Sequence, residues 1–169
     1  MLTEELTLRD MQPDDLEMVR SWRNHPNVRC HMLTQNEISA EEHAQWFGRV
    51  QQDPQRHVVL VHEQQQPLGL VHFTPVNGQG VVDWGFYLTP QAPKGSGRKL
   101  ARKALDFAFT QQGWHKVCGQ VISSNAASRR FHLKMGFRLE GVWRQQVLIK
   151  QEWLSLWCYG LLVADWIRT

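Results

Sequence analysis

Several features that would assign the chain to a class are scarce or missing. Its three cysteines, Cys30, Cys118 and Cys158, are odd in number, widely spaced and not arranged in metal-like pairs. We interpret them as reduced core thiols, which argues against a disulfide framework, a metal site and a catalytic cysteine. No apolar run is long enough to span a bilayer, and the first residues lack the character of a signal peptide. We therefore expect a cytoplasmic protein with no metal and no membrane partner.

Charge of one sign is also scarce. The formal net charge is only +3 over 169 residues, and much of it lies in one glycine loop. This distribution favours local anion binding and argues against a nucleic-acid partner. The length and the 42% hydrophobic content predict one domain over residues 1–169. Tyrosine occurs twice but tryptophan eight times, so beyond core burial several tryptophans could line a site for a flat or sugar-like ligand.

The most informative stretch covers residues 81–109. Residues 81–90 are mostly β-branched and aromatic and end at Pro90, which predicts a strand. From residue 100 onward, apolar side chains repeat with helical periodicity on one face: Leu100, Ala101, Ala104, Leu105, Ala108 and Phe109. Between the two lies Lys-Gly-Ser-Gly-Arg-Lys at residues 94–99, where a helix exposes unpaired backbone N–H groups.

This glycine loop has the features of an anion site. Glycines let backbone N–H groups turn toward a ligand, and the helix dipole favours negative charge at this end. Five basic side chains crowd the end of the helix where cations are least favoured: Lys94, Arg98, Lys99, Arg102 and Lys103. A bound anion would resolve that conflict, although a surface turn with solvated lysines is the alternative. Because Leu100 replaces the third glycine of the dinucleotide fingerprint and the Walker pattern is absent, we predict a pyrophosphate held by a different fold.

The rest of the chain predicts alternating strands and helices. Strands are expected over residues 5–9, 57–63, 68–74, 81–90, 116–122, 137–141 and 152–162. Helices are expected from Pro13, from Ser39 with Glu42 completing a capping box, after the glycine loop and after Asn125, and residues 163–167 are expected to form a short amphipathic tail. This order predicts an α/β fold in which a mixed sheet carries helices on both faces.

A longer pattern follows the glycine loop and its helix. About 25 residues on come a strand and then a helix that begins Asn-x-x-Ser at Asn125 and ends in Met-Gly-Phe at residues 135–137. This arrangement resembles the GCN5-related N-acetyltransferase (GNAT) superfamily over nearly the whole chain. The resemblance implies a sheet of about seven mostly antiparallel strands that splay apart at the centre, with acetyl-CoA as the co-substrate.

The resemblance also implies which residues hold that co-substrate. The backbone of Phe86 and Leu88 would bind the pantetheine arm, and Asn125 would lie against the cofactor. The pyrophosphate would lie on the glycine loop: Gly95, Ser96, Gly97, Arg98 and Lys99. One departure is Ala92, which stands where the superfamily pattern usually opens with Gln or Arg.

The N-terminal third is more particular. Trp-Arg-Asn at residues 22–24, residues 28–32 and Ile-Ser-Ala-Glu-Glu-His at 38–43 resemble the UDP-4-amino-4,6-dideoxy-N-acetyl-β-L-altrosamine N-acetyltransferases of pseudaminic acid biosynthesis, which supplies flagellin glycosylation. The resemblance implies six residues on the nucleotide-sugar side: Arg23, Met32, His43, Trp46, Thr74 and Tyr87. A guanidinium can clasp a diphosphate, and aromatic faces can stack on uracil and sugar. The alternatives are a helix-end cation for Arg23, a partly buried and hydrogen-bonded histidine for His43, core packing for Trp46, and ordinary strand residues for Thr74 and Tyr87.

Acetyl transfer to an amine needs a neutral amine, a polarised thioester carbonyl and a proton for the departing thiolate. The superfamily often places a tyrosine acid four residues before the Gly-Phe that closes the last helix, where this chain has His132. An imidazole could donate that proton, although His132 could equally be a partly exposed helix residue. Many relatives carry a glutamate base where Gln120 stands. The base is therefore His43, a water ordered by His43 and Gln120, or no dedicated group.

The leading hypothesis is acetyl-CoA-dependent N-acetylation of the 4-amino group of a UDP-linked 4-amino-4,6-dideoxy sugar, by direct attack within a ternary complex. One alternative keeps the cofactor and changes the acceptor to a ribosomal protein or N-terminal peptide, because the closing Tyr-Gly-Leu-Leu strand and terminal tryptophan helix are similar there. A second alternative is a non-catalytic CoA-binding module. Exposed strand edges are compatible with a homodimer. The sequence does not fix the stereochemistry of the sugar.

Overall fold

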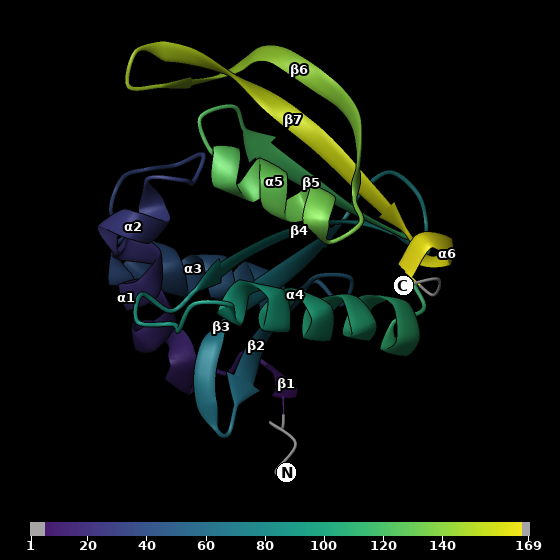
Figure 1. Ribbon diagram of the computed structural model, residues 1–169. Coiled ribbons are helices and arrows are strands. Elements are labelled where there is room, and N and C mark those ends of the chain that lie inside the picture. Colours follow the sequence, from purple (N-terminus) through teal and green to yellow (C-terminus); the bar gives the residue numbers. More distant parts are fainter. Residues whose placement is uncertain (1–5, 167–169) are drawn as a thin grey trace.

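The computed structural model describes residues 6–166 as a seven-stranded sheet with helices on both faces (Figure 1). The strands follow the spatial order β1-β2-β3-β4-β5-β7-β6. Every neighbouring pair is antiparallel except β4 and β5, which are parallel. The strands are β1 (Leu6–Asp10), β2 (His57–Glu63), β3 (Gln66–Pro75), β4 (Val81–Leu88), β5 (Lys116–Ile122), β6 (Arg138–Ile149) and β7 (Glu152–Leu162). This architecture confirms the predicted fold class.

The helices divide between the two faces of the sheet. In Figure 1, α4 and α5 lie in front of the sheet, whereas α1 and α3 pack behind it with α2 beside them. The helices are α1 (Leu16–Asn24), α2 (Pro26–Arg29), α3 (Ala40–Gln51), α4 (Ser96–Asp106), α5 (Ala126–Lys134) and α6 (Val163–Trp166). A 3-10 turn over Pro13–Asp15 leads into α1, and a π-helical turn over Phe107–Gln111 extends α4. Within residues 6–166, no helix combines the length and apolar character that crossing a membrane requires.

Strand alternation divides the core between the two faces. Val59 and Val61 of β2 join the larger apolar cluster, which lies under α4 and α5, whereas Val58 and Leu60 join the smaller cluster under α1 and α3. Successive side chains of a strand point to opposite faces, so the unbroken apolar run in β2 contributes to both clusters. The sheet is therefore held firmly from both sides at the strands that border the site.

The sheet opens at its centre. β4 and β5 pair from Val81 opposite Lys116 to Trp84 opposite Gly119, and no further pairing between them occurs within the described residues. On its other edge, β4 stays paired with β3 as far as Leu88. Backbone groups of residues 85–88 that face β5 therefore have no hydrogen-bond partner in that strand. Buried backbone N–H and C=O groups require a hydrogen-bond partner.

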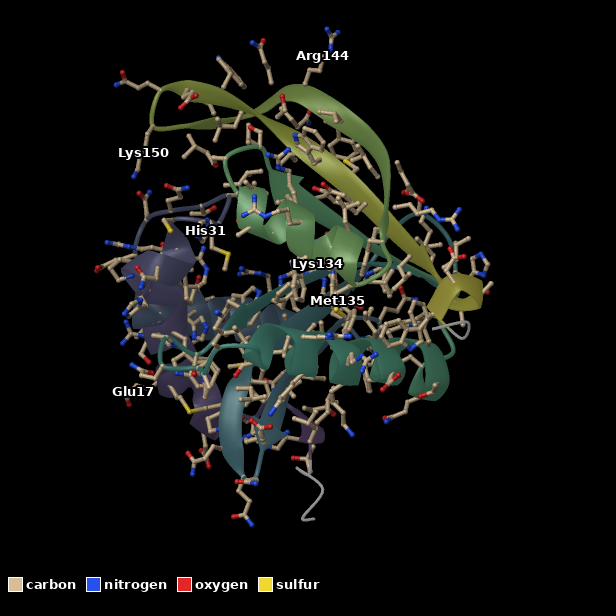
Figure 2. All side chains as sticks on the ribbon, in the orientation of Figure 1. Glu17, His31, Lys134, Met135, Arg144 and Lys150 are labelled. Atoms are coloured by element: carbon tan, nitrogen blue, oxygen red, sulfur yellow. The ribbon has the colours of Figure 1, made fainter. Side chains whose placement is uncertain are left out.

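β6 and β7 form a long hairpin above α5. Figure 2 shows Lys150 at the turn of this hairpin and Arg144 pointing outward from β6. The predicted strand over 137–141 was too short, because β6 continues to Ile149. A register shift between Trp143 and Val147, with Gln145 at φ 47°, interrupts the alternation that sequence patterns depend on. The edge position of β6 also lets polar side chains occupy it.

Most other boundaries agree with the sequence. The strands predicted over 57–63, 116–122 and 152–162 match β2, β5 and β7 residue for residue. Ser39 caps α3, and its side chain and that of Glu42 form the predicted capping box. α2 was not predicted. The predicted amphipathic tail forms the short helix α6 over Val163–Trp166. Residue 5 of the first predicted strand and residue 167 of the tail lie outside the described residues.

Candidate active site

A large cleft opens where β4 and β5 separate. Its volume is about 1170 Å³, and side chains from α1, α2, α3, β3, β4, β5 and α5 line it. His31, labelled in Figure 2, belongs to its wall beside α2. Sites for one small molecule usually enclose about 300–1,000 Å³. The volume of the cleft therefore slightly exceeds the usual range for a single small molecule.

One side of the cleft is suited to an extended chain. Phe86 and Leu88 lie on the part of β4 that is unpaired on the β5 side, and both line the cleft. An added Cβ at Gly97, in the first turn of α4, would lie 3.7 Å from the side chains of Leu88 and Phe131. The structure thus brings the open edge of β4, the start of α4 and α5 together, as predicted for the cofactor.

The glycine loop forms the cap of α4. Gly95 is the N-cap residue and has φ 94°, a left-handed conformation that favours glycine. The Ser96 N–H donates to the carbonyl of Pro93 and the Arg98 N–H to that of Gly95, so both amides bond within the turn. Ser96 is buried, whereas Gly95 and Arg98 are exposed. These bonds fix the shape of the loop at the positively polarised end of α4.

The other predicted cofactor residues differ in their surroundings. Nζ of Lys99 forms an ion pair with Glu63. Oδ1 of Asn125 accepts the Ser128 N–H at 3.1 Å and caps α5, while the residue lines the cleft. Within the loop itself, Gly97 is the predicted pyrophosphate residue found among the described lining of the cleft. Pyrophosphate binding by the remaining loop residues stays a prediction.

All six residues predicted for the nucleotide-sugar side line the same cleft, on the side formed by α1, α3 and the outer face of β4: Arg23, Met32, His43, Trp46, Thr74 and Tyr87. Arg23 ends α1 and donates through Nη2 to the carbonyl of Thr34 at 2.7 Å. Its Nη1 is buried and has no hydrogen-bond partner. Burial lowers the pKa of Arg23, and the electrostatic interaction with Tyr87 partly offsets that decrease. Burial also raises the pKa of Tyr87. Arg23 therefore lines the cleft and keeps one guanidinium nitrogen without a protein acceptor.

His43 lies across the cleft on α3. It is 4% exposed and stacks on Trp46, with ring centroids 5.1 Å apart. Burial lowers the pKa of His43, and the positive charges of Arg20 and Arg23 lower it further. Its Nδ1 has no hydrogen-bond partner. The imidazole is therefore more deeply buried than a partly buried, hydrogen-bonded histidine would be, and its Nδ1 lacks the expected hydrogen bond. It also lines the cleft, and its role toward a substrate stays a prediction.

His132 is buried, at 3% exposure, and both of its ring nitrogens are engaged. Nδ1 lies 2.8 Å from the carbonyl of Ser128, and Nε2 lies 3.1 Å from the indole Nε1 of Trp84. An indole N–H can only donate, so Nε2 must be the acceptor and Nδ1 carries the proton. Burial also lowers the pKa of His132. The general-acid role stays a prediction, and these hydrogen bonds count against it because they hold a neutral ring.

Among the titratable residues of the cleft that escaped the sequence analysis, Asp83 and His72 are the ones whose pKa burial shifts strongly. Asp83 lies on β4 with Oδ1 buried and without a hydrogen-bond partner, and burial raises its pKa to about 6. His72 lies on β3 with its ring over Gly85, where an added Cβ would be 2.2 Å from Nε2. Burial lowers the pKa of His72 to about 4. A carboxylate inside a strand of apolar and aromatic residues was the available signal for Asp83.

Comparison with known proteins agrees with this geometry. The model of the acetyltransferase (GNAT) domain family matches residues 5–138. The chain belongs to this family and is an acetyl-CoA-dependent N-acetyltransferase of the GNAT type.

Individual relatives are distant. The chain is 24% identical to acetyltransferase PseH of Campylobacter jejuni over 130 residues, which cover 77% of this chain and 81% of that protein. It is equally identical, at 24% over 143 residues, to spermidine N(1)-acetyltransferase of Vibrio cholerae, with 83% of each chain covered. A crystal structure of the spermidine N-acetyltransferase of Vibrio cholerae with CoA and spermine superposes with a TM-score of 0.88 at 22% identity, covering 96% of this chain and 98% of that one. The structural likeness establishes the fold.

Proposed function

We propose that this enzyme acetylates the 4-amino group of a UDP-linked 4-amino-4,6-dideoxy sugar, a step of pseudaminic acid biosynthesis for flagellin glycosylation. The observation that carries the proposal is the half-buried guanidinium of Arg23, whose Nη1 is aimed at no protein acceptor. A buried charge without a partner is costly, and a diphosphate supplies paired oxygens that a guanidinium binds well. The resemblance of the N-terminal third and the similarity to acetyltransferase PseH support the same substrate class.

The charges of the cleft favour an anionic acceptor over a polyamine. Arg23, Arg49 and Arg56 all line it. Among the described residues of its wall, the carboxylates are Glu42 and Asp83, and Glu42 already accepts the Ser39 N–H in the capping box. A polycation such as spermidine would need more carboxylates than this. The similarity to spermidine acetyltransferase makes the polyamine the second candidate, and this charge pattern counts against it.

The residues present fit acetyl-CoA. Bound acetyl-CoA supplies a thioester carbonyl that an amine can attack. The open edge of β4 at Phe86 and Leu88 offers backbone groups to the pantetheine amides, and the N-terminus of α4 offers positive potential to the pyrophosphate. Burial raises the pKa of the Cys118 and Cys158 thiols, which disfavours thiolates. We therefore propose direct attack of the amine on the thioester without an acetyl-cysteine intermediate.

The decisive experiment measures thiol release from acetyl-CoA with three acceptors. These are a UDP-4-amino-4,6-dideoxy sugar, a panel of N-terminal peptides, and spermidine. We expect release with the nucleotide sugar at a kcat/KM at least a hundredfold above the other two. Release with spermidine or peptides alone would show that the acceptor is assigned incorrectly.

Replacement of Arg23 tests the anion seat directly. We expect Arg23→Ala to raise the KM for the nucleotide sugar about tenfold to a hundredfold while the KM for acetyl-CoA stays unchanged, because a charge-assisted contact contributes about 1.5–3 kcal/mol. Arg144→Ala, on the exposed outer side of β6, is the matched control. An unaltered acceptor KM in Arg23→Ala would remove this residue from the acceptor site.

A further inference from the structure

We propose that Asn24, at the end of α1, is a positioning residue that fixes one wall of the cleft on the acceptor side. The inference rests on the proposed function only in placing the acceptor beside α1 and α3, and it does not depend on which amine is acetylated. The wall is residues 30–39, the irregular connection between α2 and α3. The residues of this wall that line the cleft are His31, Met32, Leu33, Thr34 and Ile38.

Asn24 binds this wall through both groups of its side-chain amide. Its Nδ2 donates to the carbonyl of Ile38 at 2.9 Å, and its Oδ1 accepts the Ile38 N–H at 2.8 Å. The two bonds join residues that are 14 positions apart in the sequence. A side-chain amide carries a donor and an acceptor side by side, which lets it pair with both backbone groups of one residue. Asn24 therefore fixes both the position and the orientation of Ile38.

Asn24 holds the wall from a firm base. It is the last residue of α1, and Val19 and Trp22 of the same helix are buried in the smaller core cluster. Asn24 itself is half-buried and lies outside the described lining of the cleft, whereas its partner Ile38 belongs to that lining. A side chain that does not border the cleft affects a bound substrate through the neighbours that do. Its role is therefore to position the wall and not to bind the acceptor.

The neighbouring residue of α1 holds the same wall at a second point. Arg23 donates through Nη2 to the carbonyl of Thr34 at 2.7 Å. The ion pair of Arg29 with Glu37 also reaches the wall, at 3.3 Å, but its carboxylate is exposed and such pairs contribute little. Two consecutive residues at the end of α1 therefore fix the wall where it lines the cleft.

The bonds of Asn24 also set where α3 begins. Ile38 precedes Ser39, the N-cap residue of α3, and His43 lies in the first turn and a half of that helix. Residues at the positions of Ile38 and His43 commonly pack together at the start of a helix, and here both line the cleft. The charge of Arg23 also reaches His43 and helps to lower its pKa. Asn24 therefore fixes the spacing between the cleft residues of α1 and those of α3.

The test replaces the amide and measures steady-state kinetics with the amine that the wild-type enzyme acetylates. Asn24→Leu keeps the approximate size of the side chain and removes both hydrogen bonds. A freed wall that takes the binding-competent position about one-tenth of the time raises the KM for the acceptor about tenfold. We expect this rise while kcat stays within about threefold and the KM for acetyl-CoA is unchanged. Asn24→Ala should give the same result, and it carries the test where Asn24→Leu does not fold.

Two control variants separate positioning from a general loss of stability. Asn24→Gln carries the same donor and acceptor on a longer stem, so it should recover part of the acceptor affinity. Asn36→Leu makes the same substitution at an exposed residue of the wall outside the described lining of the cleft, and it should keep the wild-type KM. A lower Tm in Asn24→Leu with a wild-type acceptor KM would show that Asn24 only stabilises the fold and would overturn the inference.

A double-mutant cycle tests whether Asn24 and Arg23 hold one wall. Once the first substitution has freed the wall, loss of the second contact should add little. We expect the double variant of Arg23→Ala with Asn24→Leu to have an acceptor KM within about threefold of Arg23→Ala alone. An acceptor KM equal to the product of the two single effects, or a raised KM for acetyl-CoA in Asn24→Leu, would contradict the inference. Turnover of spermidine or a peptide in place of the nucleotide sugar would contradict the proposed acceptor and leave this comparison intact.

Discussion

His132 is the residue whose contacts most clearly distinguish a structural role from a catalytic role. Its two hydrogen bonds, to the carbonyl of Ser128 and from the indole of Trp84, satisfy a buried neutral ring. Gly119 makes this possible, because an added Cβ there would lie 2.6 Å from Nε2 of His132. Asp83 is the opposite case, since its buried oxygen is unsatisfied and its pKa is raised. A perturbed group in a cleft without a protein partner is more typical of function than a fully bonded one.

These contacts predict that His132 matters more for stability than for turnover. We expect His132→Ala to lower the free energy of unfolding by about 3 kcal/mol, because it leaves a cavity and strands the Trp84 N–H. Urea unfolding measures this loss, and kcat is measured under conditions where the variant remains folded. We expect kcat per folded molecule to stay within tenfold of wild type. A hundredfold loss of kcat with little change in stability would restore the general-acid role.

Among the elements, α3 shows how a local signal positions distant chemistry. The Ser39 side chain accepts the Glu42 N–H at 3.2 Å, and the Glu42 carboxylate accepts the Ser39 N–H at 2.7 Å. This reciprocal cap fixes where the helix begins and so sets the phase of the face that carries His43 and Trp46. Phe47 and Val50 on the same side anchor the helix in the smaller core cluster.

Removal of the cap should therefore loosen one wall of the cleft. We expect Ser39→Ala to cost about 1 kcal/mol, which corresponds to roughly 2–4 °C in Tm for a chain of this size. Calorimetry or thermal circular dichroism measures the shift, with Ser124→Ala at an exposed serine as the control. An equal Tm for the two variants would show that the cap contributes little to α3.

At the scale of the whole molecule, the cleft lies between the two layers of helices. The larger core cluster holds α4 and α5 on one face, and the smaller one holds α1 and α3 on the other. The sheet splits between β4 and β5, so the open edge of β4 and the side formed by α1 and α3 border a single volume. The arginines of the cleft come from the α1 and α3 side, which gives the proposed acceptor region a positive potential.

This potential predicts a salt dependence that identifies the sign of the acceptor charge. We expect the KM for a UDP-linked amino sugar to rise severalfold between about 20 and 200 mM NaCl, since screening weakens attraction between unlike charges. The KM for an uncharged amine should stay nearly constant over the same range. Initial rates at saturating acetyl-CoA measure both. A KM for the sugar that falls with added salt would contradict a positive acceptor region.

Much of this protein was determined by its sequence. The β-branched and apolar runs in 57–63 and 116–122, the cap at Ser39 and the glycine loop before α4 are local patterns, and each gave the observed element. Local patterns are reliable because they depend on neighbours within one or two turns of the chain. The family resemblance also singled out six residues that share one cleft, and their role toward an acceptor stays a prediction.

Only the tertiary structure decided which side chains can act. Trp84 and His132 are 48 residues apart, and their hydrogen bond determines the protonation of the histidine. Asp83 gains its raised pKa from burial at the point where two strands part, and β6 extends to Ile149 because it pairs with β7 across an irregular register. Burial, pairing and pKa are properties of contacts between distant segments, so the local pattern of residues does not contain them.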